Sequence, residues 1–333
     1  MTAAESLVSA ESSVVHRRQH SLVIDAPPEV LYDLVADVTR WPVLFEPTVR
    51  VELIEKSTTS ERFELSALVN DELATWRSRR TFDRGGLLIR FAQERSMPPM
   101  TAMSGDWSFI STVAGKTEVV LRHEYSVADD APDAVAWVNR ALDTNSEREL
   151  AALARVAELH APLDHLVFKF EETLPLRGSA ADAFELVARG DLWSERLPHV
   201  IESVMDETSS VQRLTTSTVT SDGSRHTTSS IRLITPGEGI VFKQTLLPAF
   251  LIGHAGDWRF HDGPGGSTVT VRHIVAVNPQ GLEALLGPGS SLDDARVWTT
   301  ESLSKNSRIT ASYASVFAEG RASAPTDDAD ISA

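Results

Sequence analysis

The residues best suited to chemistry lie in one arginine-rich segment, ATWRSRRTF at 74–82. Side chains alternate between the two faces of a β-strand, so Trp76, Ser78, Arg80 and Phe82 are expected to share one face. A buried arginine needs a partner or a ligand, and a fixed guanidinium can stabilise the charge that develops on an enolate or ketone oxygen. We therefore predict Arg80 and Ser78 as catalytic residues. The alternative is that Arg80 forms a structural ion pair with a buried acid.

A second segment, RHTTSSIRL at 225–233, offers a similar face with more polar residues. His226, Thr228, Ser230 and Arg232 alternate onto one side of the predicted strand. Ile231 lies on the other side and competes with Arg232 for burial, so the orientation of this arginine stays open. We predict His226 and Arg232 as the catalytic candidates of this segment.

Two histidines and two glutamines lie in line with apolar residues on other predicted strands. A histidine on an apolar face is more often a hydrogen-bonded core residue than a catalyst, whereas a glutamine there could donate to a carbonyl oxygen. Aromatic residues nearby are expected to line a cavity, with plain hydrophobic core as the alternative. The predicted substrate-binding residues are Trp41, Trp76, Phe82, Phe91, Gln93, Trp107, Phe109, His123, Gln244, Trp258 and His273.

An internal repeat explains why the candidates come in pairs. Gly-Asp-Trp occurs at 105–107 and at 256–258, and Arg-His occurs at 122–123 and at 272–273. The offset stays near 150 residues, as expected of a duplicated domain. We predict an N-terminal domain at 17–161, a C-terminal domain at 162–319 and a disordered tail at 320–333.

Each copy has the pattern of an α+β domain. A strand is followed by a short helix, six strands and a long helix, which is expected near 131–159 in the first copy and near 291–318 in the second. In this arrangement the antiparallel sheet curves around the long helix and encloses a pocket.

Composition excludes several classes of function. The net charge of −16 argues against nucleic-acid and anionic-membrane partners, and the absence of cysteine excludes thiol catalysis. From the sequence we predict neither a signal peptide nor a membrane-spanning run, and the ten histidines lack metal-ligand spacing. We predict a cytoplasmic protein that needs no cofactor or metal.

Three segments resemble one known family. RWPVLFEP at 40–47, WRSRRTFD at 76–83 and GDWSF at 105–109 are similar to motifs of the polyketide aromatase/cyclases of type II synthases. These belong to the helix-grip (START/Bet v1-like) superfamily, and two fused copies match their di-domain branch. The resemblance implies two tandem helix-grip domains, with Arg80 at the position of the family's proposed catalytic arginine.

The same resemblance implies a reaction. The di-domain branch closes the first ring by an aldol reaction, C7–C12, and then dehydrates a C9-reduced poly-β-ketone that is held on an acyl carrier protein. The second copy has Trp193 without an adjacent proline and has no tryptophan in its fourth strand, so we expect the first domain to carry the ring closure. The alternatives are a non-catalytic carrier of lipids or aromatic ligands and a protein-interaction module; assembly as a homodimer stays open.

Overall fold

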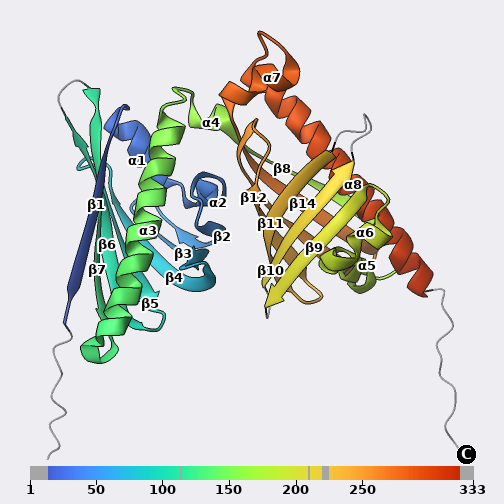
Figure 1. The fold of residues 1–333 in the computed structure, drawn as a ribbon, viewed down its shortest axis with the longest axis horizontal. Helices are drawn as coiled ribbons and strands as arrows, with labels where there is room; N and C mark the ends of the chain where they lie inside the picture. Colours follow the sequence, from blue (N-terminus) through green and yellow to red (C-terminus); the bar gives the residue numbers. More distant parts are fainter. Residues whose placement is uncertain (1–13, 113–114, 209–210, 220–224, 323–333) are drawn as a thin grey trace, which may run out of the picture. The chain divides into compact units, whose positions relative to one another are not determined.

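Two antiparallel seven-stranded sheets, each with one long helix, form the fold (Figure 1). The structure is a computed structural model that describes residues 14–112, 115–208, 211–219 and 225–322. The predicted α+β class and the tandem helix-grip architecture are confirmed. Among the described residues, no helix has the length and apolar character that a membrane span needs.

The first half begins with a strand and ends with its long helix. Its elements are β1 (His16–Ile24), α1 (Pro28–Ala36), η1 (Val38–Arg40), α2 (Trp41–Leu44), β2 (Thr48–Lys56), β3 (Ser60–Val69), β4 (Glu72–Asp83), β5 (Leu88–Arg95), β6 (Met100–Ser111), β7 (Thr117–Val127), η3 (Ala128–Asp130) and α3 (Pro132–Ala157). The sheet order is β1-β7-β6-β5-β4-β3-β2. Because β1 pairs with β7, the first strand of the chain lies beside the last strand of the sheet.

The second half repeats this order. Its elements are α4 (Leu163–Leu166), β8 (Val167–Leu176), α5 (Ala180–Ala188), η4 (Gly190–Leu192), α6 (Trp193–Arg196), β9 (Val200–Thr208), β10 (Val211–Val219), β11 (Arg225–Thr235), β12 (Gly239–Leu246), β13 (Leu251–Gly263), β14 (Gly266–Val277), η5 (Pro279–Gly281), α7 (Leu282–Leu286) and α8 (Leu292–Ala322). The sheet order, β8-β14-β13-β12-β11-β10-β9, is that of the first sheet. The two Gly-Asp-Trp segments lie on equivalent strands, β6 and β13, as a duplication requires.

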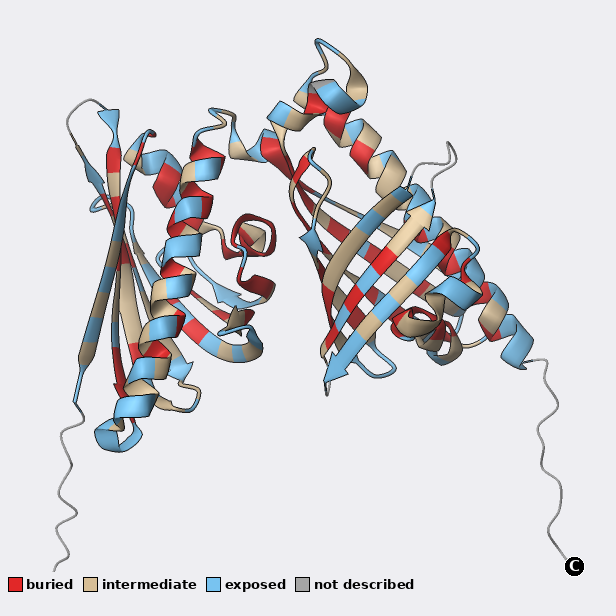
Figure 2. Cartoon of the chain, in the orientation of Figure 1, coloured by how far each residue is buried: buried red, intermediate tan, exposed pale blue. Residues whose placement is uncertain are grey.

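The long helices bury one stripe of side chains (Figure 2). On α3 this stripe contains Val138, Leu150 and Leu153, whereas on α8 it contains small residues such as Ala311 and Ala314. The helix α8 continues to Ala322, so residues 320–322 are helical and do not belong to the predicted tail. Arg321 pairs there with Asp182 and Glu185, and it holds the last turn against α5. Residues 323–333 lie outside the described residues.

The contacts within the chain define two compact units, one of Met1–Thr39 with Arg50–Glu158 and one of Arg40–Val49 with Leu159–Ala333. The sequence analysis did not predict that Arg40–Val49 joins the second unit. In this unit the buried Lys243 donates hydrogen bonds to the carbonyl oxygens of Phe45, Glu46 and Thr48 at 2.7–2.8 Å. Ile231 pairs with Lys243 across the sheet and is 2% exposed. The segment therefore covers the face of β11 opposite to Arg232, which explains why Ile231 and Arg232 are both buried.

Candidate active site

One row of residues crosses the first sheet at the level of the candidate site. Cross-strand pairing places Glu61, Arg80, Phe91, Gly105 and His123 side by side on β3, β4, β5, β6 and β7. The Phe91 ring lies over Gly105, where a Cβ atom would come within 2.5 Å of it. The edge of the ring meets His123, with 5.4 Å between the centroids. Glycine is therefore required at 105, because the Arg122 carbonyl oxygen, 2.0 Å from such a Cβ atom, and the Phe91 ring occupy the space of a side chain.

The second sheet contains the equivalent row. Gln212, Arg232, Phe242, Gly256 and His273 pair across β10, β11, β12, β13 and β14. Phe242 packs over Gly256 and meets His273 at 5.9 Å, as Phe91 does in the first sheet. The repeated sequence motifs thus build the same phenylalanine–glycine–histidine packing in each domain.

Arg80 lies on the predicted inner face of β4 and is 1% exposed. Its Nε and Nη2 donate to Glu61 Oε1 at 2.9 and 2.6 Å. Its Nη1 and Nη2 also donate to the carbonyl oxygens of Val35 and Ala36, the last two residues of α1, at 2.9 and 2.7 Å. The Phe82 ring lies 5.2 Å from the guanidinium. These contacts match the alternative interpretation of Arg80, a structural ion pair that also caps a helix.

Arg232 occupies the same position without an acid opposite it. It is 3% exposed, and its Nη2 donates to the Val187 carbonyl near the end of α5 at 2.5 Å. The carbonyl oxygen of Ala188, the last residue of α5, accepts a hydrogen bond from Gln212 Nε2 instead, at 3.1 Å. Arg232 Nη1 is buried without a hydrogen-bond partner. Burial lowers the pKa of Arg232 to about 10, with partial opposition from the more distant Glu207 and Asp191.

In the interior of the first domain, two polar atoms have no hydrogen-bond partner. Trp76, Gln93 and His123 are half-buried there, and Ser78 is buried in register with Gln93. Gln93 Oε1 and His123 Nδ1 are both buried and unpartnered. Burial, with a smaller contribution from His20, lowers the pKa of His123 to about 3, so this histidine is neutral at physiological pH. A neutral imidazole and an amide can each donate to or accept from a carbonyl or enol oxygen.

In the second domain the histidine of the row is hydrogen-bonded through both ring nitrogens. His273 Nδ1 lies 2.9 Å from His254 Nε2, and His273 Nε2 lies 3.0 Å from Ser307 Oγ. All three side chains are buried, and the two imidazole rings are stacked. Burial lowers the pKa of His273 to about 4 and that of His254 well below its usual value. The sequence analysis identified His273 but not His254, whose counterpart in the first domain is Met103.

The remaining predicted residues divide into two groups. Trp41, Trp107, Phe109 and Trp258 are at most 9% exposed and form part of the hydrophobic packing, which was the alternative for the aromatic residues. The polar residues His226 and Gln244 are half-buried on β11 and β12. In the described part of the chain, no group of His, Asp and Glu side chains has the arrangement of a metal site.

Two acids near the first interior were missed. Glu61 was detectable only through strand pairing, since it is distant in sequence from Arg80. Glu149 had a local signal, because helical spacing places it on the same face of α3 as Asn145 and Val156. In the second domain Asn306 and Ser307 repeat Asn145 and Ser146, so Thr310 stands at the position of Glu149.

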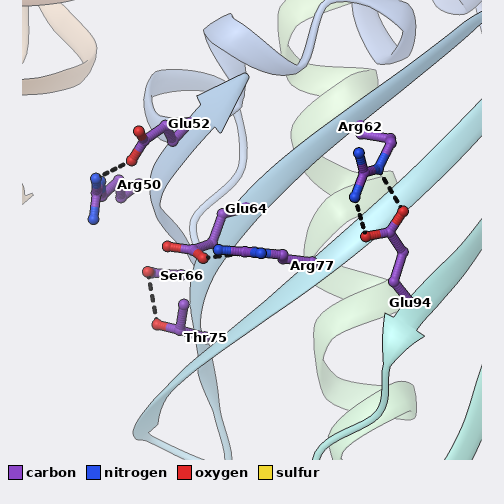
Figure 3. Close-up of polar contacts among 8 residues, drawn as sticks. All are labelled: Arg50, Glu52, Arg62, Glu64, Ser66, Thr75, Arg77 and Glu94. Atoms are coloured by element: carbon purple, nitrogen blue, oxygen red, sulfur yellow. Dashed lines mark hydrogen bonds and ion pairs between the residues drawn. The ribbon is translucent and has the colours of Figure 1, made fainter. Parts of the chain in front are cut away.

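The outer face of the first sheet carries exposed ion pairs (Figure 3). Arg77 donates to Glu64 at 3.2 Å, and Arg62 binds both carboxylate oxygens of Glu94 at 2.6 and 3.0 Å. Arg77 and Arg79 are exposed, as expected from the alternation of β4.

Known proteins of one family are similar to this chain, and the family model matches it in two places, one in each domain. The family model described as polyketide cyclase/dehydrase and lipid transport matches residues 24–148 and 176–314. A granaticin polyketide synthase bifunctional cyclase/dehydratase of Streptomyces violaceoruber is 48% identical, covering 94% of this chain and 97% of the relative. The actinorhodin polyketide synthase bifunctional cyclase/dehydratase of Streptomyces coelicolor is 44% identical, covering 91% of this chain and 97% of the relative.

Two crystal structures are similar over the whole fold. The di-domain ARO/CYC BexL from the BE-7585A biosynthetic pathway has a TM-score of 0.72 and 40% identity, covering 91% of this chain and 99% of BexL. The di-domain ARO/CYC StfQ from the steffimycin biosynthetic pathway has a TM-score of 0.70 and 33% identity, covering 92% of this chain and 100% of StfQ.

Proposed function

This chain belongs to the polyketide cyclase/dehydrase and lipid-transport family as a cyclase/dehydratase, and we propose that it closes and aromatises the first ring of a carrier-bound poly-β-ketone. The bond formed is C7–C12, and the substrate is a chain reduced at C9. Similarity to the bifunctional cyclase/dehydratases supports the two steps, aldol closure and loss of water. The similarity to di-domain ARO/CYC structures supports a whole-chain function that uses both domains.

The interior of the first domain is the proposed reaction site. The observation that carries this assignment is the pair of unpartnered polar atoms, Gln93 Oε1 and His123 Nδ1. Buried polar atoms without partners are unfavourable, so a substrate that supplies enol hydroxyls and carbonyl oxygens is stabilised there. A poly-β-ketone chain has these groups at alternate carbons.

The proposed mechanism relies on orientation and proton transfer. A poly-β-ketone enolises readily and cyclises in several ways unaided, so the enzyme selects one folded conformer by the shape of its pocket. Trp76 and Phe91 would pack against the chain, while Ser78, Gln93 and His123 would hold its oxygens. Arg80 is a positioning residue in this scheme, because its contacts to Glu61 and α1 hold β4 and the Trp76–Ser78 segment in place.

Reconstitution with a minimal synthase tests the proposal. A ketosynthase pair, an acyl carrier protein and a C9 ketoreductase supply the substrate, and carbon-13 labelling with NMR locates the new bond. We expect a C7–C12 aromatic product in place of shunt products. A protein that binds the chain or a related aromatic compound without changing the product distribution would be a carrier.

His123→Ala and Arg79→Ala form a matched pair of variants for this assay. His123 lies in the interior, whereas Arg79 is exposed on the opposite face of the sheet. We expect His123→Ala to lower the rate of on-path product by about 10²-fold, in the range of acid–base and orientation effects. Arg79→Ala should leave the product and its rate unchanged. Equal rates for the two variants would exclude His123 from the reaction.

A further inference from the structure

A carboxyl group lies in the interior of the first domain, in the middle of the buried face of α3. Glu149 follows Asn145 by one helical turn and precedes Leu153 by another, and residues at this spacing share a face. Asn145 points toward the sheet, since its Nδ2 donates to the Leu68 carbonyl of β3 at 2.9 Å. Leu153 is 1% exposed. The Glu149 side chain is therefore directed inward with its neighbours.

Glu149 has accessible surface although it faces inward. It is half-buried, and burial alone raises its pKa to about 8. His123 shows the same combination of accessible surface and a burial-dominated pKa. In the described part of the chain, the Glu149 side chain has no hydrogen bond or ion pair, so its carboxyl group is available to a bound molecule.

A surface groove lies close to this position. It has a volume of about 280 Å³ and lies between α3 and the turn that joins β3 to β4. Asn145, one turn before Glu149, lines the groove, and Arg140 and Arg148 also line it.

We propose that Glu149 is a catalytic acid of the first domain and transfers its proton to the acceptor carbonyl during ring closure. This proposal rests on the proposed cyclase function. As the enol carbon bonds to the acceptor carbonyl carbon, the Glu149 O–H proton passes to the acceptor oxygen. The enol O–H proton passes to the other carboxyl oxygen of Glu149. The two π bonds, enol C=C and acceptor C=O, are replaced by the new carbon–carbon bond and by the C=O of the former enol. The carboxyl group ends neutral and needs no other base.

The test compares three variants in the reconstituted synthase assay. Glu149→Gln keeps the size and hydrogen bonding of the side chain but has no acidic proton, and we expect its on-path rate to fall about 10²-fold. Glu149→Asp keeps a carboxyl group and should recover at least a tenth of the wild-type rate. Glu147→Gln, on the exposed side of the same helix, should match the wild type. Thermal melting should show Glu149→Gln to be folded and at least as stable as the wild type, because it removes a buried ionisable group.

Each outcome decides the proposal. A Glu149→Gln protein with the wild-type rate would show that another group supplies the proton. A Glu149→Asp protein as slow as Glu149→Gln would show that the position contributes shape instead of acidity. If the wild type itself gives only shunt products, the cyclase function fails together with the role of Glu149. Wild-type activity with an unaffected glutamine variant removes Glu149 alone.

Discussion

The buried arginines of the two domains occupy equivalent positions but are compensated differently. Arg80 pairs with the fully buried Glu61 and caps the last two carbonyls of α1. Arg232 faces Gln212, shares the capping of α5 with it and keeps one unpartnered nitrogen. The packing row of phenylalanine, glycine and histidine is the same in both sheets. Duplication thus preserved the steric pattern of the site while its electrostatics diverged.

The histidines at the end of each row show the same divergence. His123 leaves Nδ1 without a partner in an interior that also contains Gln93 and Glu149. His273 is held between His254 and Ser307. A histidine with an unpartnered nitrogen is available to a polar substrate, whereas a histidine that is bonded at both nitrogens is held within the fold. This difference supports the assignment of ring closure to the first domain.

The largest expected difference concerns removal of the two arginines. Arg80→Met leaves the Glu61 carboxylate, whose side chain is 0% exposed, without its counter-ion. Loss of one partner of a buried ion pair destabilises by about 3–5 kcal/mol. Arg232→Met leaves no charge behind and should destabilise by about 1–2 kcal/mol, for the lost cap and packing. Urea unfolding with domain-resolved hydrogen exchange measures both free energies.

This expectation changes the use of Arg80 variants in activity assays. Arg80→Ala removes the same charge, so its loss of stability should likewise exceed the ordinary effect of a point change. With Glu61 buried beside it, a loss of activity in that variant would report unfolding as much as chemistry. The double variant Arg80→Met with Glu61→Leu removes both charges and should recover most of the lost stability. Equal destabilisation by Arg80→Met and Arg232→Met would contradict the comparison.

The next effect is a loss of stability of the first domain as the pH rises. The pKa of Glu149 is raised to about 8 from its usual 4.5 by burial. Its contribution to stability is therefore fully present below pH 4.5 and is lost as pH rises through 8. Between pH 6 and pH 9 the first domain should lose about 2 kcal/mol, whereas the second domain has Thr310 at this position. Hydrogen exchange of peptides from each domain separates the two, and Glu149→Gln should abolish the loss in the first domain.

A smaller effect is expected for the histidine pair of the second domain. His254→Met copies the residue of the first domain, Met103, and leaves His273 Nδ1 without its partner. We expect a destabilisation of about 1–2 kcal/mol with the on-path product retained, because the reaction is assigned to the first domain. Loss of the aromatic product from a folded His254→Met protein would transfer the chemistry to the second domain.

The local parts of this architecture were predictable from the sequence, because they depend on periodicity. Strand alternation correctly placed Arg80 with Trp76 and Ser78 on the inner face. The repeat correctly indicated two domains of the same fold. Glu149 could also have been found, since it interrupts the buried face of a helix that the sequence predicts.

Contacts between residues that are distant in the sequence were not predictable from periodicity. Glu61 meets Arg80 only through the register of β3 with β4, which depends on the turn between them. Ile231 was expected to compete with Arg232 for a single buried face, but the segment Arg40–Val49 buries the other face as well. His254 stands where the first copy has Met103, so the repeat could not indicate a histidine there.

The smallest expected effect concerns the outer faces of the two sheets, where we expect the differences between the domains to leave the reaction unchanged. Glu64 and Arg77 form an exposed ion pair in the first sheet (Figure 3), and the equivalent residues of the second sheet, Thr215 and Ser229, join their hydroxyl groups at 2.8 Å. The double variant Glu64→Thr with Arg77→Ser copies the second pair into the first sheet. Exposed ion pairs contribute at most about 1 kcal/mol, and cross-strand hydroxyl pairs contribute a similar amount. The free energy of unfolding should therefore change by less than about 0.5 kcal/mol, with the same product and rate. A loss of several kcal/mol, or a changed product, would contradict this expectation. It would show that the outer face of β4 helps to position the residues of its inner face, so that the two faces are not independent.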